Sequence, residues 1–177
     1  MTEGELSRVV RTNAGLCAMW QPESFDFAEF EDWEDWVTDH SNVADAIRNG
    51  LLVPLNVGGD GVWQILVRWG ENPRLAESEQ RVLLVSSEPY LVVSKGRLEL
   101  GGLEDVGETS PKDNVIPVGE GRFQVEAHLI DWKADPGSVD PSGKPAAAAL
   151  PDFVVLIRPD AGGPYRTEIS SFGRPAG

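Results

Sequence analysis

Residues 51–69 read LLVPLNVGGDGVWQILVRW, and this stretch decides the fold class. Two runs rich in β-branched, aliphatic and aromatic residues, 51–57 and 62–69, flank a link at 58–61 that holds three glycines. Runs of this kind are typical of β-strands, and glycine readily adopts the positive φ angles of tight turns. The stretch therefore predicts a β-hairpin.

Most of the remaining chain also alternates as β-strands do. Upstream, residues 8–12 and 14–20 predict two short strands broken near residues 13–15. Further strands are predicted at 81–86, 90–94, 97–100, 122–132, 153–157 and 165–169. We expect the last two of these to form an antiparallel pair across the turn between them.

The segment from Glu23 to Asp39 has a different period. It reads ESFDFAEFEDWEDWVTD, and its apolar residues Phe27, Phe30, Trp33 and Val37 recur every three or four positions. That spacing lines one face of a helix, and residues 42–49 predict a second short helix. The predicted fold class is α+β: a mostly antiparallel, twisted sheet with one short helical layer from about residues 27–49.

Size and composition indicate one globular domain over residues 1–177. The chain has a mass of 19.2 kDa, and 41% of its residues are hydrophobic and 25% charged. We expect loose ends near 1–6 and 172–177, and a flexible loop near 135–150, where proline and alanine are frequent. The single cysteine, Cys17, excludes an internal disulfide and a four-cysteine zinc site, and it predicts a reducing compartment.

The net charge of −14 limits the classes of partner. Nucleic acids and anionic membranes bind largely through Lys and Arg, so neither is an expected partner. A basic protein is the partner that this charge favours. The N-terminal residues lack the features of an export signal, and no apolar run approaches the roughly 20 residues of a membrane span, so we expect a cytoplasmic protein.

No motif in the chain indicates catalysis or a cofactor. The glycine-rich link at 58–61 lacks the lysine of a phosphate-binding loop, and no G-x-S-x-G sequence marks a nucleophile. The acidic stretch lacks the ligand spacing and the glycine turn of a calcium loop. The sequence thus predicts no metal site and no cofactor, and it favours a protein without enzymatic activity.

The acidic segment is the best candidate site. Between Glu23 and Asp39 it places eight carboxylates among five large aromatic residues, with no Lys or Arg. If Phe30 and Trp33 face the core, Trp36 lies at the margin of the helix, where it could anchor a partner. The predicted partner-binding residues are Glu31, Asp32, Glu34, Asp35, Trp36 and Asp39. The same text also fits an ordinary amphipathic helix with a solvated face.

In size, charge and lack of catalytic motifs, the chain resembles small acidic inhibitor or immunity proteins. That resemblance implies a non-enzymatic binding protein that neutralises a basic bacterial effector or nuclease. Two alternatives stay open. One is an enzyme or small-ligand-binding protein with a pocket lined by Trp and carboxylates. The other is a structural or regulatory domain that self-associates through a sheet edge, and the oligomeric state is not specified by the sequence.

Overall fold

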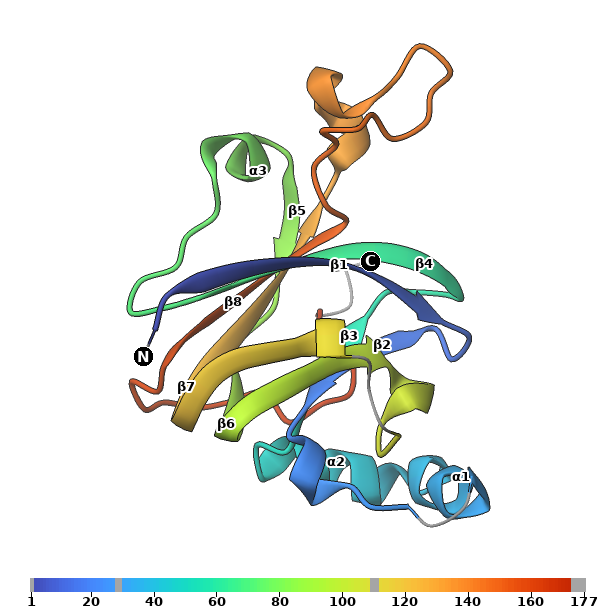
Figure 1. Ribbon diagram of the computed structural model, residues 1–177, viewed down its shortest axis with the longest axis vertical. Coiled ribbons are helices and arrows are strands. Elements are labelled where there is room, and N and C mark those ends of the chain that lie inside the picture. Colours follow the sequence, from blue (N-terminus) through green and yellow to red (C-terminus); the bar gives the residue numbers. More distant parts are fainter. Residues whose placement is uncertain (1, 28–29, 109–111, 173–177) are drawn as a thin grey trace.

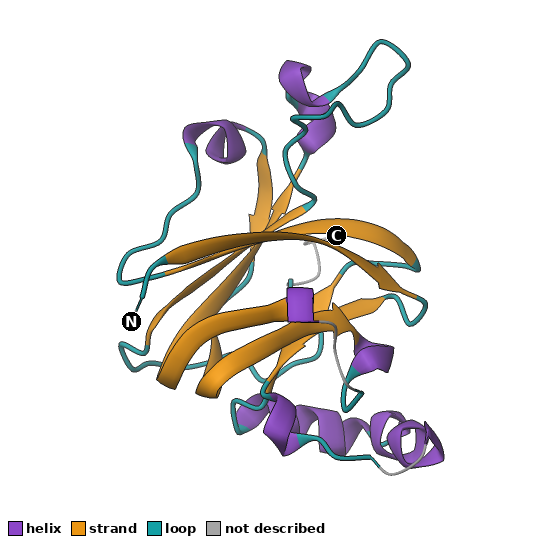
Figure 2. Cartoon of the chain, viewed as in Figure 1, coloured by secondary structure: helices purple, strands orange, loops and turns teal. Residues whose placement is uncertain are grey.

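The computed structural model describes residues 2–27, 30–108 and 112–172, and it confirms the predicted α+β class (Figures 1 and 2). The strands are β1 (Gly4–Thr12), β2 (Leu16–Trp20), β3 (Leu52–Asn56), β4 (Gly61–Trp69), β5 (Leu83–Ser86), β6 (Tyr90–Gly102), β7 (Val115–Ile130) and β8 (Phe153–Pro159). The α-helices are α1 (Phe30–Thr38), α2 (His40–Arg48) and α3 (Glu77–Arg81). Short 3-10 turns are η1 (Pro22–Ser24), η2 (Leu103–Asp105), η3 (Lys112–Asn114), η4 (Trp132–Ala134) and η5 (Pro136–Ser138).

The hairpin predicted for residues 51–69 is wrong, because β3 and β4 do not pair with each other. Instead β3 pairs antiparallel with β2, and β4 pairs antiparallel with β1. The result is one long two-stranded ladder that bends at a corner, where an added Cβ on Gly15 would lie 3.5 Å from the Cα of Gly59. Gly15 and Gly58 have φ angles of 65° and 83° there. The glycines allow the segment from β1 to β2 and the segment from β3 to β4 to bend together at the corner. Neither segment folds back on itself as a hairpin would.

The strand order is β1-β4-β8-β7-β6-β2-β3, with β5 paired to β7. Among the described strands β4 and β8 alone run parallel, so the sheet is mostly antiparallel, as predicted. Because the ladder joins the two ends of this order, the sheet folds over into two facing layers (Figure 2). The predicted pairing of residues 153–157 with 165–169 is wrong. Strand β8 already has β4 and β7 on its two edges, and residues 165–169 are not in a strand.

The main core lies between the two layers and continues into the space between the sheet and helices α1 and α2. Its largest fully buried side chains are Trp20, Tyr90, Phe153, Met19, Ile47, Leu52, Leu55, Ile65, Leu98, Leu100, Ile116 and Ile157. Helices α1 and α2 lie below β2, β3 and β6 in Figure 1, and α2 buries Val43, Ala46 and Ile47 against the sheet. The predicted helical layer over residues 27–49 is therefore present, with its first helix beginning at Phe30.

A second, smaller apolar cluster covers the outer face of β4, β7 and β8. It contains Leu66, Ile130, Val154 and Leu156, with partly buried Leu75 and Val82 packed against it. Residues 4–6, which we expected to be loose, belong to β1 because Gly4 pairs with Trp69. The segment 135–150 projects from the sheet (Figure 1) and contains η5 and a bridge between Val139 and Pro145; its flexibility stays a prediction.

Candidate functional site

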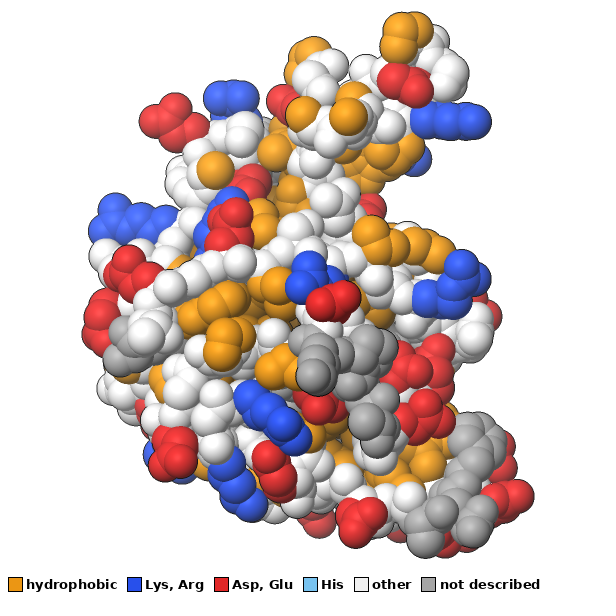
Figure 3. Space-filling view, in the orientation of Figure 1, with side chains coloured by type: hydrophobic (Ala, Val, Ile, Leu, Met, Phe, Trp, Pro, Cys, Tyr) orange, Lys and Arg blue, Asp and Glu red, His pale blue; other side chains and the backbone are white. Residues whose placement is uncertain are grey.

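Helix α1 presents a row of carboxylates to solvent. Glu31, Asp32, Glu34 and Asp35 are all exposed, whereas Trp33 is half-buried. Trp33 packs against the core and donates a hydrogen bond from Nε1 to the carbonyl oxygen of Leu103, at 3.2 Å. The four carboxylates and the exposed Asp39 that follows the helix are called the acidic face below. Figure 3 shows acidic side chains on this side of the molecule, over the position of α1 in Figure 1.

Asp39 also has a structural role, which no sequence pattern indicated. It is the N-cap of α2, and its Oδ1 accepts hydrogen bonds from Ser41 Oγ at 2.6 Å and from Ser41 N at 2.9 Å. These two bonds hold the pKa of Asp39 below its usual value, because they favour the charged carboxylate. Helix α2 therefore begins at His40, two residues before the predicted start.

Trp36 does not project as a free anchor. Its ring lies 5.4 Å from the ring of Phe25, at an interplanar angle of 75°, and 5.6 Å from the ring of Phe27. The side chain is half-buried and packs against the main core. The physical reason is tertiary: the residues just after η1 bring Phe25 and Phe27 to α1. The expected orientation of Phe30 concerns a side chain outside the described part of the structure.

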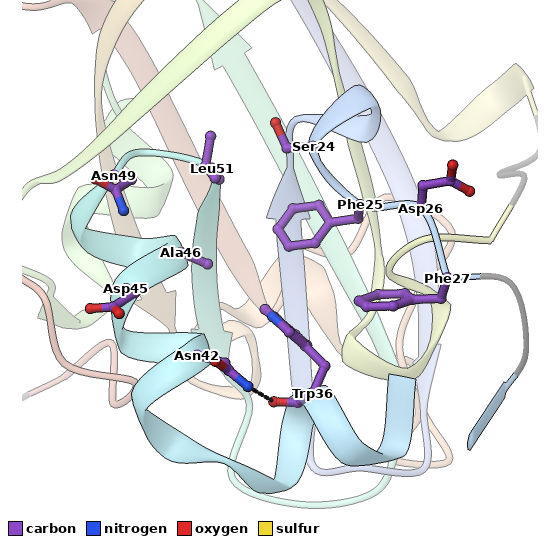
Figure 4. A pocket seen from close by; sticks show the side chains of 10 residues that line it. All are labelled: Ser24, Phe25, Asp26, Phe27, Trp36, Asn42, Asp45, Ala46, Asn49 and Leu51. Atoms are coloured by element: carbon purple, nitrogen blue, oxygen red, sulfur yellow. Dashed lines mark hydrogen bonds between the residues drawn. The ribbon is translucent and has the colours of Figure 1, made fainter. Parts of the chain in front are cut away.

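A pocket of about 360 Å³ lies between this aromatic group and α2 (Figure 4). It is lined by Ser24, Phe25, Asp26, Phe27, Trp36, Asn42, Asp45, Ala46, Asn49 and Leu51. Asn42 Nδ2 donates to the backbone oxygen of Trp36 at 3.3 Å, which ties α2 to α1 across the floor. We call it the aromatic pocket. Its lining includes Trp36 and two carboxylates, Asp26 and Asp45, but both carboxylates are exposed, and the Trp- and carboxylate-lined pocket of the alternative hypothesis stays a prediction.

The charge around the aromatic pocket is mostly negative. From Glu23 to Asp45 the sequence contains nine acidic residues and no Lys or Arg, and Arg48 is the first base after them. Arg48 forms an ion pair with Asp45 on the surface of α2, and Arg97 forms another with Glu23 at 3.5 Å, so at least two of the nine carboxylates are paired with cations. Such a concentration of negative charge attracts cationic groups over distances of about 8–10 Å at moderate ionic strength.

A second polar cluster involves His128 on β7. Its Nδ1 lies 2.7 Å from Ser86 Oγ, and its Nε2 lies 4.0 Å from Glu126 Oε2. Burial lowers the pKa of His128, and the charge of Glu126 partly opposes that effect. Ser86 lies on a strand instead of a nucleophile elbow, and Glu126 is engaged by Arg158 and Gln124. The cluster is best described as a structural network that fixes β5 to β7.

The sequence could have placed part of this network. His128 and Glu126 fall on the same phase of the strand predicted at 122–132, which puts them on one face. The partner Ser86 depends on the pairing of β5 with β7, which no local pattern specifies.

Across residues 2–27, 30–108 and 112–172, no group of three or more His, Cys, Asp or Glu side chains is arranged to hold a metal ion. In the same ranges, no helix combines the length and the apolar character that crossing a membrane requires.

Comparison with known proteins finds other chains with a similar fold but assigns this chain to no family. The sequence matches no protein-family model, and it matches no curated protein. Two solved structures are similar. The first, described as crocagin biosynthetic gene J, is 15% identical with a TM-score of 0.62, over 90% of this chain and 99% of that one. The second is ComJ from Bacillus subtilis, an inhibitor of the DNA degrading activity of NucA. It is 10% identical with a TM-score of 0.51, over 90% of this chain and 100% of that one. At these identities the likeness shows a shared fold.

Proposed function

We propose that this protein is a non-enzymatic inhibitor that binds a basic protein, such as a bacterial nuclease or another basic effector. The observation that carries the proposal is the acidic face on α1, with its exposed carboxylates beside a pocket with aromatic walls. A nuclease binds phosphates through Lys and Arg, so a surface rich in carboxylates can occupy the same cationic groups. ComJ, which shares the fold, inhibits the DNA degrading activity of a nuclease, and this adds support by analogy.

The two parts of the site would contribute differently to binding. Exposed charges chiefly raise the association rate, whereas a desolvated aromatic contact chiefly slows dissociation. In this proposal Glu31, Asp32, Glu34, Asp35 and Asp39 orient the partner, and the group around Trp36 holds it. A cytoplasmic location belongs to the same proposal, and the buried free thiol of Cys17 is compatible with it.

The test compares two variants of equal net charge as baits for proteins from the native host. The face variant carries Glu31→Gln, Glu34→Gln and Asp35→Asn. The control variant carries Asp60→Asn, Glu77→Gln and Glu120→Gln, three exposed residues on other parts of the surface. We expect the wild type and the control variant to retain the same basic protein, and the face variant to lose it. Salt should weaken the retained complex.

A purified complex then tests inhibition directly. We expect the nuclease or effector activity of the retained protein to fall when wild-type protein is added, and to recover as the ionic strength rises. Equal retention of the partner by both variants would mean that the acidic face does not bind it. Retention of no protein at low ionic strength would remove the proposal itself.

The aromatic pocket also favours a second candidate, a small-ligand-binding protein. Its volume of about 360 Å³ is within the range of about 300–1,000 Å³ for small-molecule sites. A metabolite fraction that raises the melting temperature of the wild type, but not of an Ala46→Leu variant with a filled pocket, would support this function.

The edge strand β5 favours self-association as a third candidate. Within the described residues β5 pairs with β7 alone, and Leu83 and Leu84 on it are 36% and 60% exposed. An unpaired edge with apolar side chains can template pairing with another chain. Light scattering that finds a monomer at high concentration would count against this function.

A further inference from the structure

The walls of the aromatic pocket are held rigidly by one another. Phe25, Phe27 and Trp36 are mutual neighbours, with ring centroids 5.4 to 6.4 Å apart. Phe25 is 8% exposed, so this ring belongs to the core as well as to the pocket. An aromatic wall that is already packed loses little freedom when it binds a ligand.

The opposite wall is polar and comes from α2. Asn42, Asp45 and Asn49 line the pocket on that side, and Figure 4 shows all three on α2, with Asn42 hydrogen-bonded to the backbone of Trp36. Because Asn42 Nδ2 donates to the backbone oxygen of Trp36, the amide oxygen of Asn42 remains as an acceptor. The pocket thus combines an aromatic surface with hydrogen-bond acceptors, and carboxylates lie at its rim.

This combination fits a planar cation. A guanidinium group stacks on an aromatic face and donates hydrogen bonds at its edges, whereas an ammonium group is a compact, strongly hydrated point charge. An apolar side chain would fill the same volume, but it would gain nothing from the nine acidic residues between Glu23 and Asp45. The surrounding charge therefore favours a cation as occupant.

We propose that the aromatic pocket receives an arginine side chain of the partner, stacked on Trp36. The proposal rests on the function proposed above, and it names the chemical group that the partner must supply. A cation–π contact at a partly desolvated site corresponds to an affinity gain of about 5- to 30-fold. Lysine should gain less, since its ammonium group is more strongly hydrated.

The experiment uses two peptides of equal charge, hexa-arginine and hexa-lysine, with the full chain at low ionic strength. The indole N–H resonance of Trp36 is followed by NMR after assignment through bonds. We expect both peptides to bind the acidic face, and hexa-arginine to bind about 5- to 30-fold more tightly. We expect only hexa-arginine to shift the Trp36 resonance saturably and more than those of the other tryptophans.

Two variants separate the pocket from the face. Trp36→Leu, which keeps an apolar side chain, should bring the affinity for hexa-arginine down to that for hexa-lysine. The face variant with Glu31→Gln, Glu34→Gln and Asp35→Asn should bind both peptides more weakly. The ratio of the two affinities should stay the same. If Trp36→Leu proves unstable, Ala46→Leu fills the same pocket from α2 and should have the same effect on the ratio.

Each outcome bears on one of the two proposals. The arginine-pocket proposal is wrong if the Trp36 resonance of the wild type does not respond to hexa-arginine. It is also wrong if a folded pocket variant still binds hexa-arginine more tightly than hexa-lysine by the wild-type factor. In either case the inhibitor proposal stands. If neither peptide binds the wild type, the acidic face does not recognise cations and the inhibitor proposal fails with it.

Discussion

Arg68 and Glu79 form a bidentate ion pair, with Nη1 2.6 Å from Oε2 and Nη2 2.8 Å from Oε1. Glu79 is 2% exposed, and its Oε2 also accepts a hydrogen bond from the backbone N–H of Ala76 at the start of α3. The hydrogen bonds from Arg68 to Glu79 raise the pKa of Arg68. Because α3 is only five residues long, this ion pair is a main attachment of the helix to β4.

Glu79→Gln should therefore destabilise the protein. The substitution leaves Arg68 without its buried counter-charge, and breaking such a pair costs about 3–5 kcal/mol of unfolding free energy. Urea unfolding followed by fluorescence measures the loss. The matched control is Glu5→Gln, which removes the exposed partner of the same arginine and should cost under about 1 kcal/mol. Equal losses would mean that burial of the pair is unimportant.

His128 should make stability depend on pH below about 6.5. Burial lowers its pKa from the ordinary value of 6.5, so the unfolded chain takes up a proton at a higher pH than the folded protein does. The contribution of neutral His128 to the free energy of unfolding is fully present above pH 6.5. It is lost as the pH falls through the lower pKa of His128 in the folded state. We expect the urea midpoint to decline in this window, and to decline less in His128→Gln. A decline of unchanged size in that variant would assign the effect to other groups.

Cys17 should be unreactive in the folded protein. The thiol is fully buried, and burial raises its pKa to about 12, with smaller contributions from the charges of Glu104 and Asp105. At pH 8 the thiolate fraction is then about one part in ten thousand. We expect an aromatic disulfide reagent to label the native chain only at the rate of unfolding, and to label the exposed control Ala148→Cys at once. Rapid labelling of native Cys17 would contradict its burial.

Trp36→Ala should lower stability as well as binding. Its ring packs against Phe25 and Phe27, and removing a half-buried tryptophan costs about 1–3 kcal/mol. The face variant Glu31→Gln, Glu34→Gln and Asp35→Asn should keep or slightly raise the melting temperature, because it reduces self-repulsion in a chain of charge −14. Calorimetry of both variants gives the comparison. An unchanged melting temperature for Trp36→Ala would show that its packing contributes little.

The corner of the long ladder should depend on backbone conformation. Gly15 has a φ of 65°, where an L side chain costs about 1–2 kcal/mol, so Gly15→Ala should lose about that much stability. Gly59 in the facing link has no positive φ and open space around an added Cβ. Gly59→Ala should therefore be close to neutral by denaturant unfolding. A neutral Gly15→Ala would mean that the corner adapts to a different conformation.

Local patterns in the sequence identify the elements of this fold but not their partners. The alternation in residues 62–69 predicts β4, and the spacing of Phe27, Trp33 and Val37 predicts a helix, because both signals depend on neighbours within a few residues. The partners of β4 come from residues 4–12 and 153–157, far away in the chain. A glycine-rich link is compatible with a hairpin and with a shared corner, so sequence alone could not choose between them.

The candidate site divides in the same way. The exposed carboxylates of α1 follow from composition and helical period. The aromatic pocket does not, since it needs Phe25 and Phe27 to fold back onto Trp36 and needs α2 to form the opposite wall. The same dependence explains why Trp36 packs against Phe25 and Phe27, whereas the helical period placed it at the margin of the helix as a free anchor.

The position of β8 constrains how the protein can be made. This strand lies in the middle of the sheet, between β4 and β7, yet it is the last strand within the described residues. During synthesis the two-stranded ladder built from residues 4–69 can form early, but it keeps an open edge along β4 until residues 153–157 leave the ribosome. One edge of this apolar strand therefore stays unpaired while roughly half of the chain, from residue 70 to residue 157, is synthesised. A holding chaperone would have its natural target on β4.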